Sequence, residues 1–304
     1  MLVIVLCGVT LLSFFFANLS PTDPAEAFVR RTTSNPTPEQ VEIVRQEMGL
    51  DRPFMEQYLT WIGKALKGDF GTSLLTRMPV ANELPGVFMA TLGLAAMAML
   101  FTILMTVPVS IFTAANKGGL FDQVTRVVTI LGISLPNFWI GCMLIVLFAI
   151  IIPIFKVVDF GSIKSTVLPA LALAIPISAS GIRMFRSSLI SSYQSDFVVY
   201  ARARGLPESK VRRIVLKHSL PPMITLLFQQ FGFALAGSAT VEAVFSWPGI
   251  GSYMIKAILS RDLPAINACV LVIAVAFVLL NFTADMLNLL ISPNMEETRE
   301  GYYV

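Results

Sequence analysis

The chain has 304 residues, of which 55% are hydrophobic and only 13% are charged, and its formal net charge is +3. Soluble domains carry about 25% charged residues, so this composition excludes an ordinary soluble enzyme and a disordered protein. A net charge this small also excludes a nucleic-acid binder.

Six segments are apolar over about 20 residues, the length that a helix needs to cross the hydrocarbon core of a bilayer. They are residues 1–19, 87–115, 127–155, 166–184, 223–245 and 265–291. We therefore predict an all-α, polytopic membrane protein with six transmembrane helices. Residues 1–19 lack a basic start and a convincing cleavage site, so we expect them to stay as the first span and not to be removed as a signal peptide.

The segment between the first two spans, residues 20–86, contains two predicted amphipathic helices. The sequence from Thr37 to Gln40 is typical of a capping box, and the helix that it begins would end at Gly49. A second helix begins near Pro53 and carries an apolar stripe formed by Phe54, Tyr58, Trp61, Ile62 and Ala65. These helices could lie on the lipid interface, cap the outer mouth of a pore or bind a partner.

The spans contain few ionisable residues. Asp285 lies within the sixth span and Glu242 near the outer end of the fifth. With Asn281, they are candidate polar residues of a pore or of a contact between helices. Because ion-coupled carriers usually place ionisable groups at membrane depth, this scarcity favours an energy source outside the chain. An ion-coupled secondary carrier that works alone is the alternative from another class.

The segment between the fourth and fifth spans, residues 183–221, is called the inner loop here. Residues 183–218 hold eight basic and two acidic side chains, a net charge of +6, whereas residues 20–86 hold seven basic and nine acidic ones. Because basic short loops stay in the cytoplasm, we expect the inner loop, the N-terminus and the tail 292–304 inside, and residues 20–86 outside. Residues 87–291 would then form the transmembrane core.

The inner loop is predicted to fold as two short helices. The first is capped by Ser195 or Asp196 and ends at Gly205, and the second begins after Pro207. Residues 221 and 222 are both proline and are predicted to break the second helix before the fifth span. The chain has no GxxxxGK[ST] phosphate loop, so this structured loop suggests a docking element. A basic face that contacts anionic lipid is the other interpretation.

Chemistry-bearing residues are sparse. Cys7, Cys142 and Cys269 lie far apart in apolar runs, and His218 is the single histidine. We therefore expect no disulfide framework, no metal site and no cofactor bound by this chain. Without paired carboxylates or a His/Cys cluster, a membrane enzyme is disfavoured and no catalytic residue is predicted.

Several blocks resemble the permeases of binding-protein-dependent ABC importers. In the inner loop, Val199-Tyr200-Ala201 stands where the family's EAA loop has Glu-Ala-Ala, and Gly205 and Leu220-Pro221 follow. The form Ala201-Arg202-Ala203-Arg204-Gly205-Leu206 is similar to the nickel/dipeptide/oligopeptide branch. Further blocks of that branch are residues 49–53, 68–73, 79–80, 245–251 and 261–264. The block 134–139 and the short loop 156–165 resemble the nickel-type first permease.

The resemblance implies the type I ABC importer permease fold in the bacterial inner membrane. It also implies a second homologous permease subunit, two cytoplasmic subunits that use ATP and Mg, an extracytoplasmic solute-binding protein and contact with membrane lipid. The substrate would be nickel, free or chelated, with dipeptides or oligopeptides as the alternative. The residues that would couple the chain to an ATPase are Tyr200, Ala201, Arg202, Ala203, Arg204, Gly205 and Leu206.

These coupling residues would have different roles. Ala201 and Ala203 would allow close approach of the ATPase, and Tyr200 and Leu206 would supply apolar contact. The two arginines, at positions 202 and 204, could pair with acidic groups of the partner, and Gly205 would permit the turn.

Overall fold

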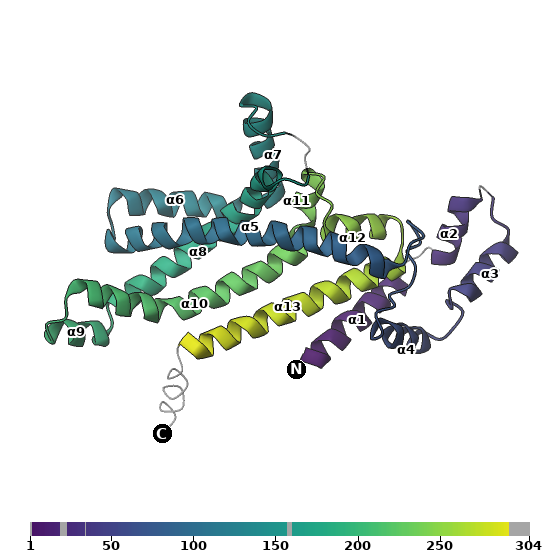
Figure 1. Cartoon of the computed structure of the whole chain (residues 1–304), viewed down its shortest axis with the longest axis horizontal. Helices are drawn as coiled ribbons and strands as arrows, with labels where there is room; N and C mark the ends of the chain where they lie inside the picture. The colour runs from purple at the N-terminus through teal and green to yellow at the C-terminus, as the bar shows by residue number, and fades with distance from the viewer. Residues whose placement is uncertain (1, 19–22, 34, 157–159, 292–304) are drawn as a thin grey trace, which may run out of the picture. The chain divides into compact units, whose positions relative to one another are not determined.

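Helices make up the regular structure of this chain. The computed structural model describes residues 2–18, 23–33, 35–156 and 160–291, and within them the other paired backbone is one antiparallel bridge between Thr72 and Pro79 (Figure 1). The chain divides into two units, which we describe separately. The first unit contains Met1–Leu92 and Trp247–Val278, and the second contains Gly93–Ser246 and Leu279–Val304. The expected all-α class is confirmed.

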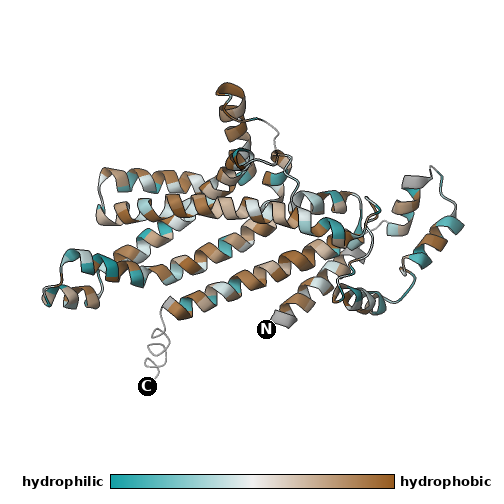
Figure 2. Ribbon diagram, in the orientation of Figure 1, coloured by the Kyte–Doolittle hydropathy of each residue, from teal (hydrophilic) through white to brown (hydrophobic). Residues whose placement is uncertain are grey.

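Three helices of the described residues are long and apolar enough to cross a membrane. They are α5 (Val80–Ala115), α8 (Ile163–Tyr193) and α13 (Leu263–Ile291). Figure 2 shows their largely hydrophobic composition, and polar residues gather on α9 (Asp196–Ala203) and the adjoining start of α10 (Glu208–Gly237). The three helices contain the second, fourth and sixth predicted spans, and each extends beyond the predicted bounds.

The third predicted span, residues 127–155, is not one straight helix. The chain forms α6 (Leu120–Ser134) and then α7 (Asn137–Ile145), which continues as the π-helical segment η1 (Val146–Ile151). The two parts meet at a bend of 102°. Pro136 explains the break, because a proline disfavours helical backbone in the residue before it, and Leu135 is extended with ψ 131°.

The first predicted span contains α1 (Leu2–Asn18), and the fifth, residues 223–245, covers the second half of α10 and the short helix α11 (Ala239–Val244). By length and composition, the described residues supply three spanning helices, or four when the bent pair counts as one span. The number six therefore stays a prediction.

The predicted helix break at the two prolines of the inner loop is wrong, because α10 runs through Pro221 and Pro222 without interruption. Proline has a helical φ, and its cost inside a helix comes from the missing donor and from crowding of the preceding turn. Here Met223, 2% exposed, packs in the core at the same turn. The Thr225 hydroxyl donates to the Pro221 carbonyl at 3.2 Å. Burial of this turn thus stabilises helical backbone here, although the two prolines donate no backbone hydrogen bond.

The first unit contains α1, α2 (Pro24–Thr32), α3 (Pro38–Glu47), α4 (Phe54–Ala65) and α12 (Ile250–Leu259), with the ends of α5 and α13. The predicted capping box of α3 is confirmed: Gln40 N donates to Thr37 Oγ1, and the Gln40 side chain accepts from Thr37 N. Gly49 follows in the left-handed conformation, with φ 67°.

In the second unit, α8 contacts α6, α7, α10 and α11 (Ala239–Val244). One close approach depends on Gly181 of α8, because a Cβ atom there would lie 3.0 Å from Thr106 Oγ1 of α5. The short helix α9 contacts α10 (Figure 1). The core of this unit is called the core cluster below, and its buried members are Ala114, Phe185, Leu189, Val198, Ala201, Val211, Val215 and Met223.

Candidate functional site

The inner loop folds as a helix, a glycine turn and a second helix, as its sequence predicts. At the end of α9, Gly205 N donates to Arg202 O at 2.9 Å and Leu206 N donates to Ala201 O at 3.2 Å. These two bonds, with Gly205 at φ 72°, form a Schellman helix end, which favours glycine because other residues are strained there. The turn directs the chain back along α10.

The inward side of α9 is fixed to the core cluster. Val198 is 1% exposed and Ala201 is 7% exposed, and both pack among side chains of α8 and α10. Leu206 is half-buried against the same cluster. Ala201 and Leu206, which the sequence suggested as contacts for a partner, therefore lie behind the outer face of the loop and support it.

The outward side of α9 is apolar at its centre and basic around it. Tyr200 is 71% exposed and Val199 is 63% exposed, and Ala203 is exposed one turn after Val199. Arg202 and Arg204 are exposed beside them. Sequence reasoning missed Val199, although its spacing of four residues from Ala203 already placed both on one helix face.

Arg202 already has a partner within the chain. Its Nε lies 2.8 Å from Glu208 Oε1, and both side chains are about half exposed. The Arg202 guanidinium lowers the pKa of Glu208, and the carboxylate raises the pKa of Arg202. In the part of the chain that the structure describes, Arg204 has no ion pair.

A second contact joins α9 to α10. The rings of Phe197 and His218 stack with their centroids 4.4 Å apart. His218 therefore supports the loop by packing.

A buried ion pair clamps the start of α6 to α8. Asp122 Oδ1 lies 2.6 Å from Arg186 Nε, and Asp122 Oδ2 lies 2.8 Å from Arg186 Nη2. Gly118 N donates to the same carboxylate at 2.9 Å, and the Asp122 side chain is 1% exposed. Arg186 is one of the eight basic residues of the inner loop, and Asp122 is not among the site residues predicted from the sequence. Since 64 positions separate the two, no local pattern joins them.

The three polar candidates of the predicted pore lie on two helices. Glu242 of α11 is fully buried and accepts a hydrogen bond from Ser238 Oγ at 2.8 Å. Asn281 and Asp285 lie one turn apart on α13, where Asn281 is half-buried and Asp285 is exposed. Their role in a pore stays a prediction.

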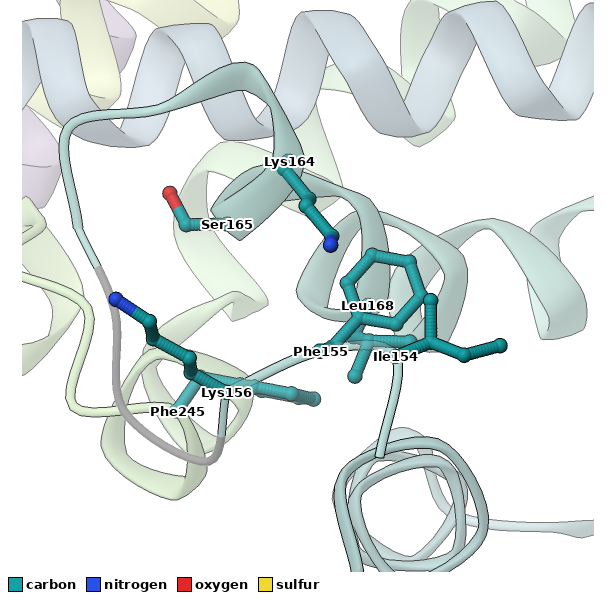
Figure 3. Close-up of a pocket in the computed structure, with 7 residues that line it drawn as sticks. All are labelled: Ile154, Phe155, Lys156, Lys164, Ser165, Leu168 and Phe245. Atoms are coloured by element: carbon teal, nitrogen blue, oxygen red, sulfur yellow. The ribbon is translucent and has the colours of Figure 1, made fainter. Parts of the chain in front are cut away.

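A small basic pocket of about 70 Å³ is lined by residues 154–156 after η1, by the start of α8 and by Phe245 after α11 (Figure 3). Lys156, Lys164 and Phe245 contribute to its lining, and Figure 3 shows Lys164 extending over Phe155. The Lys164 ammonium is 5.5 Å from the centroid of that ring. Within the described ranges, neither lysine has an ion pair. No local sequence pattern pairs these two lysines, because Lys156 follows η1 and Lys164 lies in the first turn of α8.

In the first unit, blocks of sequence that are far apart converge. Ser73 Oγ donates to Asp262 Oδ2 at 2.5 Å, and residue Asp262 is 1% exposed. Trp247 Nε1 donates to the Ala90 carbonyl at 3.0 Å. The Tyr253 hydroxyl donates to Glu83 Oε2 at 2.8 Å. The blocks at 68–73, 245–251 and 261–264 thus hold the ends of α5 and α13 together.

The chain matches known protein families over most of its length. Residues 106–297 match the family described as "Binding-protein-dependent transport system inner membrane component", and residues 1–95 match the N-terminal component of the same transport systems. The chain is similar to the glutathione transport system permease protein GsiC of Escherichia coli (strain K12) and of Shigella dysenteriae serotype 1 (strain Sd197). Each is 35% identical over 291 residues, which cover 94% of this chain and 92% of the relative. The chain therefore belongs to the binding-protein-dependent transport family, as a multi-pass inner-membrane permease subunit of an ABC importer that works with ATPase and solute-binding partners.

Proposed function

We propose that this chain forms half of a translocation pathway together with a second homologous permease subunit. Two cytoplasmic subunits would bind ATP and Mg, and a solute-binding protein would deliver substrate from outside. The inner loop and both termini would lie in the cytoplasm. The +6 charge of residues 183–218 supports this orientation, because basic short loops are retained on that side.

The observation that carries the coupling role is the two-sided packing of α9. Val198 and Ala201 fix one side to the core cluster, while Val199 and Tyr200 expose apolar surface on the other. An exposed apolar surface with arginines around it is typical of a site that binds another protein. When ATP binding closes the ATPase pair, α9 would move with its partner and displace α8 and α10 through the core cluster.

Within this role the coupling residues divide into three groups. Tyr200, Ala203 and the added Val199 would form the apolar contact. Arg204 would pair with an acid of the ATPase, while Arg202 orders the loop through Glu208. The other coupling residues, Ala201, Gly205 and Leu206, would set the shape of the loop.

The proposed substrate is a small peptide-like molecule with a free carboxylate. The relatives named above are glutathione permeases, and glutathione is such a molecule. The pocket between Lys156 and Lys164 offers two ammonium groups that would attract a carboxylate. A nickel chelate is the second candidate, favoured by the nickel-type form of residues 134–139 and by the short loop 156–165.

Substitution of Gly205 tests the coupling role. Gly205→Asp in the assembled transporter should leave membrane insertion intact and abolish the stimulation of ATPase activity by loaded binding protein. Gly68→Asp is the matched control, since Gly68 also has a positive φ and open space around its Cβ position. Normal stimulation in the Gly205 variant would refute the coupling role.

Transport assays test the class and the substrate. Proteoliposomes that contain the whole transporter should import glutathione or a dipeptide only with ATP, and calorimetry of the binding protein should rank these ligands against nickel chelates. Uptake by this chain alone, driven by an ion gradient, would instead support the secondary carrier.

A further inference from the structure

Helix α4 carries more apolar surface than its neighbours in the chain cover. Phe54, Tyr58 and Trp61 share one face with Ala65, and this face is at least partly buried. A second apolar row follows at spacings of four, three and four residues, formed by Met55, Leu59, Ile62 and Leu66. We call these four residues the exposed stripe: Met55 is 53%, Leu59 59% and Leu66 84% exposed, and Ile62 between them is half-buried.

The first face of α4 packs against α1, mainly around Phe14. The hydroxyls of Tyr58 and Thr10 are hydrogen-bonded at 2.9 Å, and Tyr58 Oη donates to the Cys7 carbonyl at 3.3 Å. Phe14 of α1 contacts the rings of Phe54, Tyr58 and Trp61, with centroid distances of 5.5 to 6.3 Å. Tyr58 and Trp61, two members of the apolar stripe predicted from the sequence, therefore pack against α1.

The position of these contacts along α1 sets the depth of α4. Thr10 lies eight residues before Asn18, the last residue of α1, which corresponds to about 12 Å along a helix axis. One leaflet of the hydrocarbon core is about 15 Å thick. Residues 2–18 contain no charged side chain, and Leu12 and Phe16 are 56% and 66% exposed. If α1 spans the bilayer with its C-terminal end outside, α4 lies beside it within the outer leaflet.

The polar face of α4 points to a different environment. Gln57, Thr60 and Lys64 line a groove of about 740 Å³ in the first unit, which also includes Arg52 and Asp69. The residues of the exposed stripe are not part of its lining. The groove has a mixed polar and apolar lining, to which α4 contributes these polar side chains. The helix therefore places its polar side chains towards this groove and bare apolar surface on its other side, as a helix at a membrane interface does.

From these contacts we propose that α4 is an in-plane membrane anchor whose exposed stripe contacts the acyl chains of the outer leaflet. Lipid is the occupant that fits, because the stripe continues the uncharged, exposed surface of α1 and adds no charge of its own. The anchor would hold the groove lined by Gln57, Thr60 and Lys64 at the membrane surface. This inference rests on the proposed orientation of the chain but not on its substrate.

Site-directed spin labelling tests the anchor. The assembled transporter is reconstituted in phosphatidylethanolamine–phosphatidylglycerol liposomes with Cys7, Cys142 and Cys269 replaced by alanine. Single cysteines are then introduced as Leu59→Cys and, as the matched control one residue along, Thr60→Cys. We expect the label at 59 to collide with dissolved oxygen at least several-fold more than with a water-soluble relaxant, and the label at 60 to show the reverse preference.

The other occupants give different results. Equal exposure of both labels to the water-soluble relaxant would overturn the proposal. Shielding of the label at 59 from both relaxants would assign the exposed stripe to a protein contact. If the shielding appeared only when the binding protein or the second permease was present, that protein would be the contact. Transport is measured on the same samples. Because the spin label reports the depth of α4 whether or not the sample transports substrate, a failure of the anchor can be told apart from a failure of the proposed function.

Discussion

Replacing Asp122 by asparagine should destabilise the second unit far more than the loss of any ion pair at its surface. The carboxylate accepts two bonds from Arg186 and one from Gly118 N, and its side chain is 1% exposed. Removal of one partner from a buried pair leaves the other charge uncompensated, at a cost of about 3–5 kcal/mol. The Arg186 side chain is 19% exposed and keeps some hydration, so we expect about 3 kcal/mol for Asp122→Asn.

The chain provides a matched control for this prediction. Arg202 and Glu208 form an ion pair of similar length, but their side chains are 50% and 53% exposed. Exposed pairs contribute little because water solvates and screens both charges. Glu208→Gln should therefore leave the unfolding midpoint nearly unchanged.

Reversible unfolding in mixed micelles by a titration with sodium dodecyl sulfate gives the free energies. A double-mutant cycle of Asp122→Asn and Arg186→Gln should show a coupling energy of at least about 1 kcal/mol, as expected for residues in direct contact. If Asp122→Asn and Glu208→Gln changed stability equally, or if the two effects of the cycle simply added, the assignment of Asp122 as a buried clamp would be wrong.

Three further predictions follow from single sites. Gly205→Ala should cost about 1–2 kcal/mol of stability, because alanine is strained in the left-handed backbone conformation of this position. Steric clash adds nothing, since no atom lies within 4 Å of the Cβ position. Gly205→Asn should cost less in the same titration. The pKa of Tyr253 is raised by burial and by its bond to Glu83, so this tyrosine should stay neutral where others ionise, near pH 10. The stability tied to it is complete below that pH and declines as pH rises toward the folded-state pKa, which Tyr253→Phe and ultraviolet titration would reveal. Lys156→Gln or Lys164→Gln should raise KM for a substrate with a free carboxylate about two- to fivefold and leave an amidated analogue unaffected, in a transport assay.

Elements with a periodic or local signal were predictable from the sequence. The capping box of α3 depends on two residues three positions apart, and the glycine turn after α9 depends on Gly205 itself. The long apolar runs of α5, α8 and α13 required only composition. In each case the physical cause lies within a few residues, so a single sequence contains it.

The features that the sequence missed depend on packing between distant segments. Pro136 bends the chain between α6 and α7, whereas Pro221 and Pro222 continue a helix, although all three are prolines in or beside apolar runs. The difference lies in the turn around each proline: Met223 is buried in the core cluster beside Pro222, whereas Leu135 before Pro136 is extended and exposed. The pairing of Asp122 with Arg186 and the burial of Ala201 have the same origin.

The arrangement of the second unit indicates how a displacement at α9 would spread. Helix α9 contacts α10, and both share the core cluster with α8. Because packed interiors do not compress, a push on the outward face at Tyr200 would move these elements together. Helix α8 in turn contacts α6, α7 and α11, and the Asp122–Arg186 pair fixes α6 to it. The variant Asp122→Asn should therefore reduce the stimulation of ATPase activity as well as the stability of the second unit. If a destabilised Asp122→Asn variant kept full stimulation, the displacement of α9 would not depend on the contact between α6 and α8.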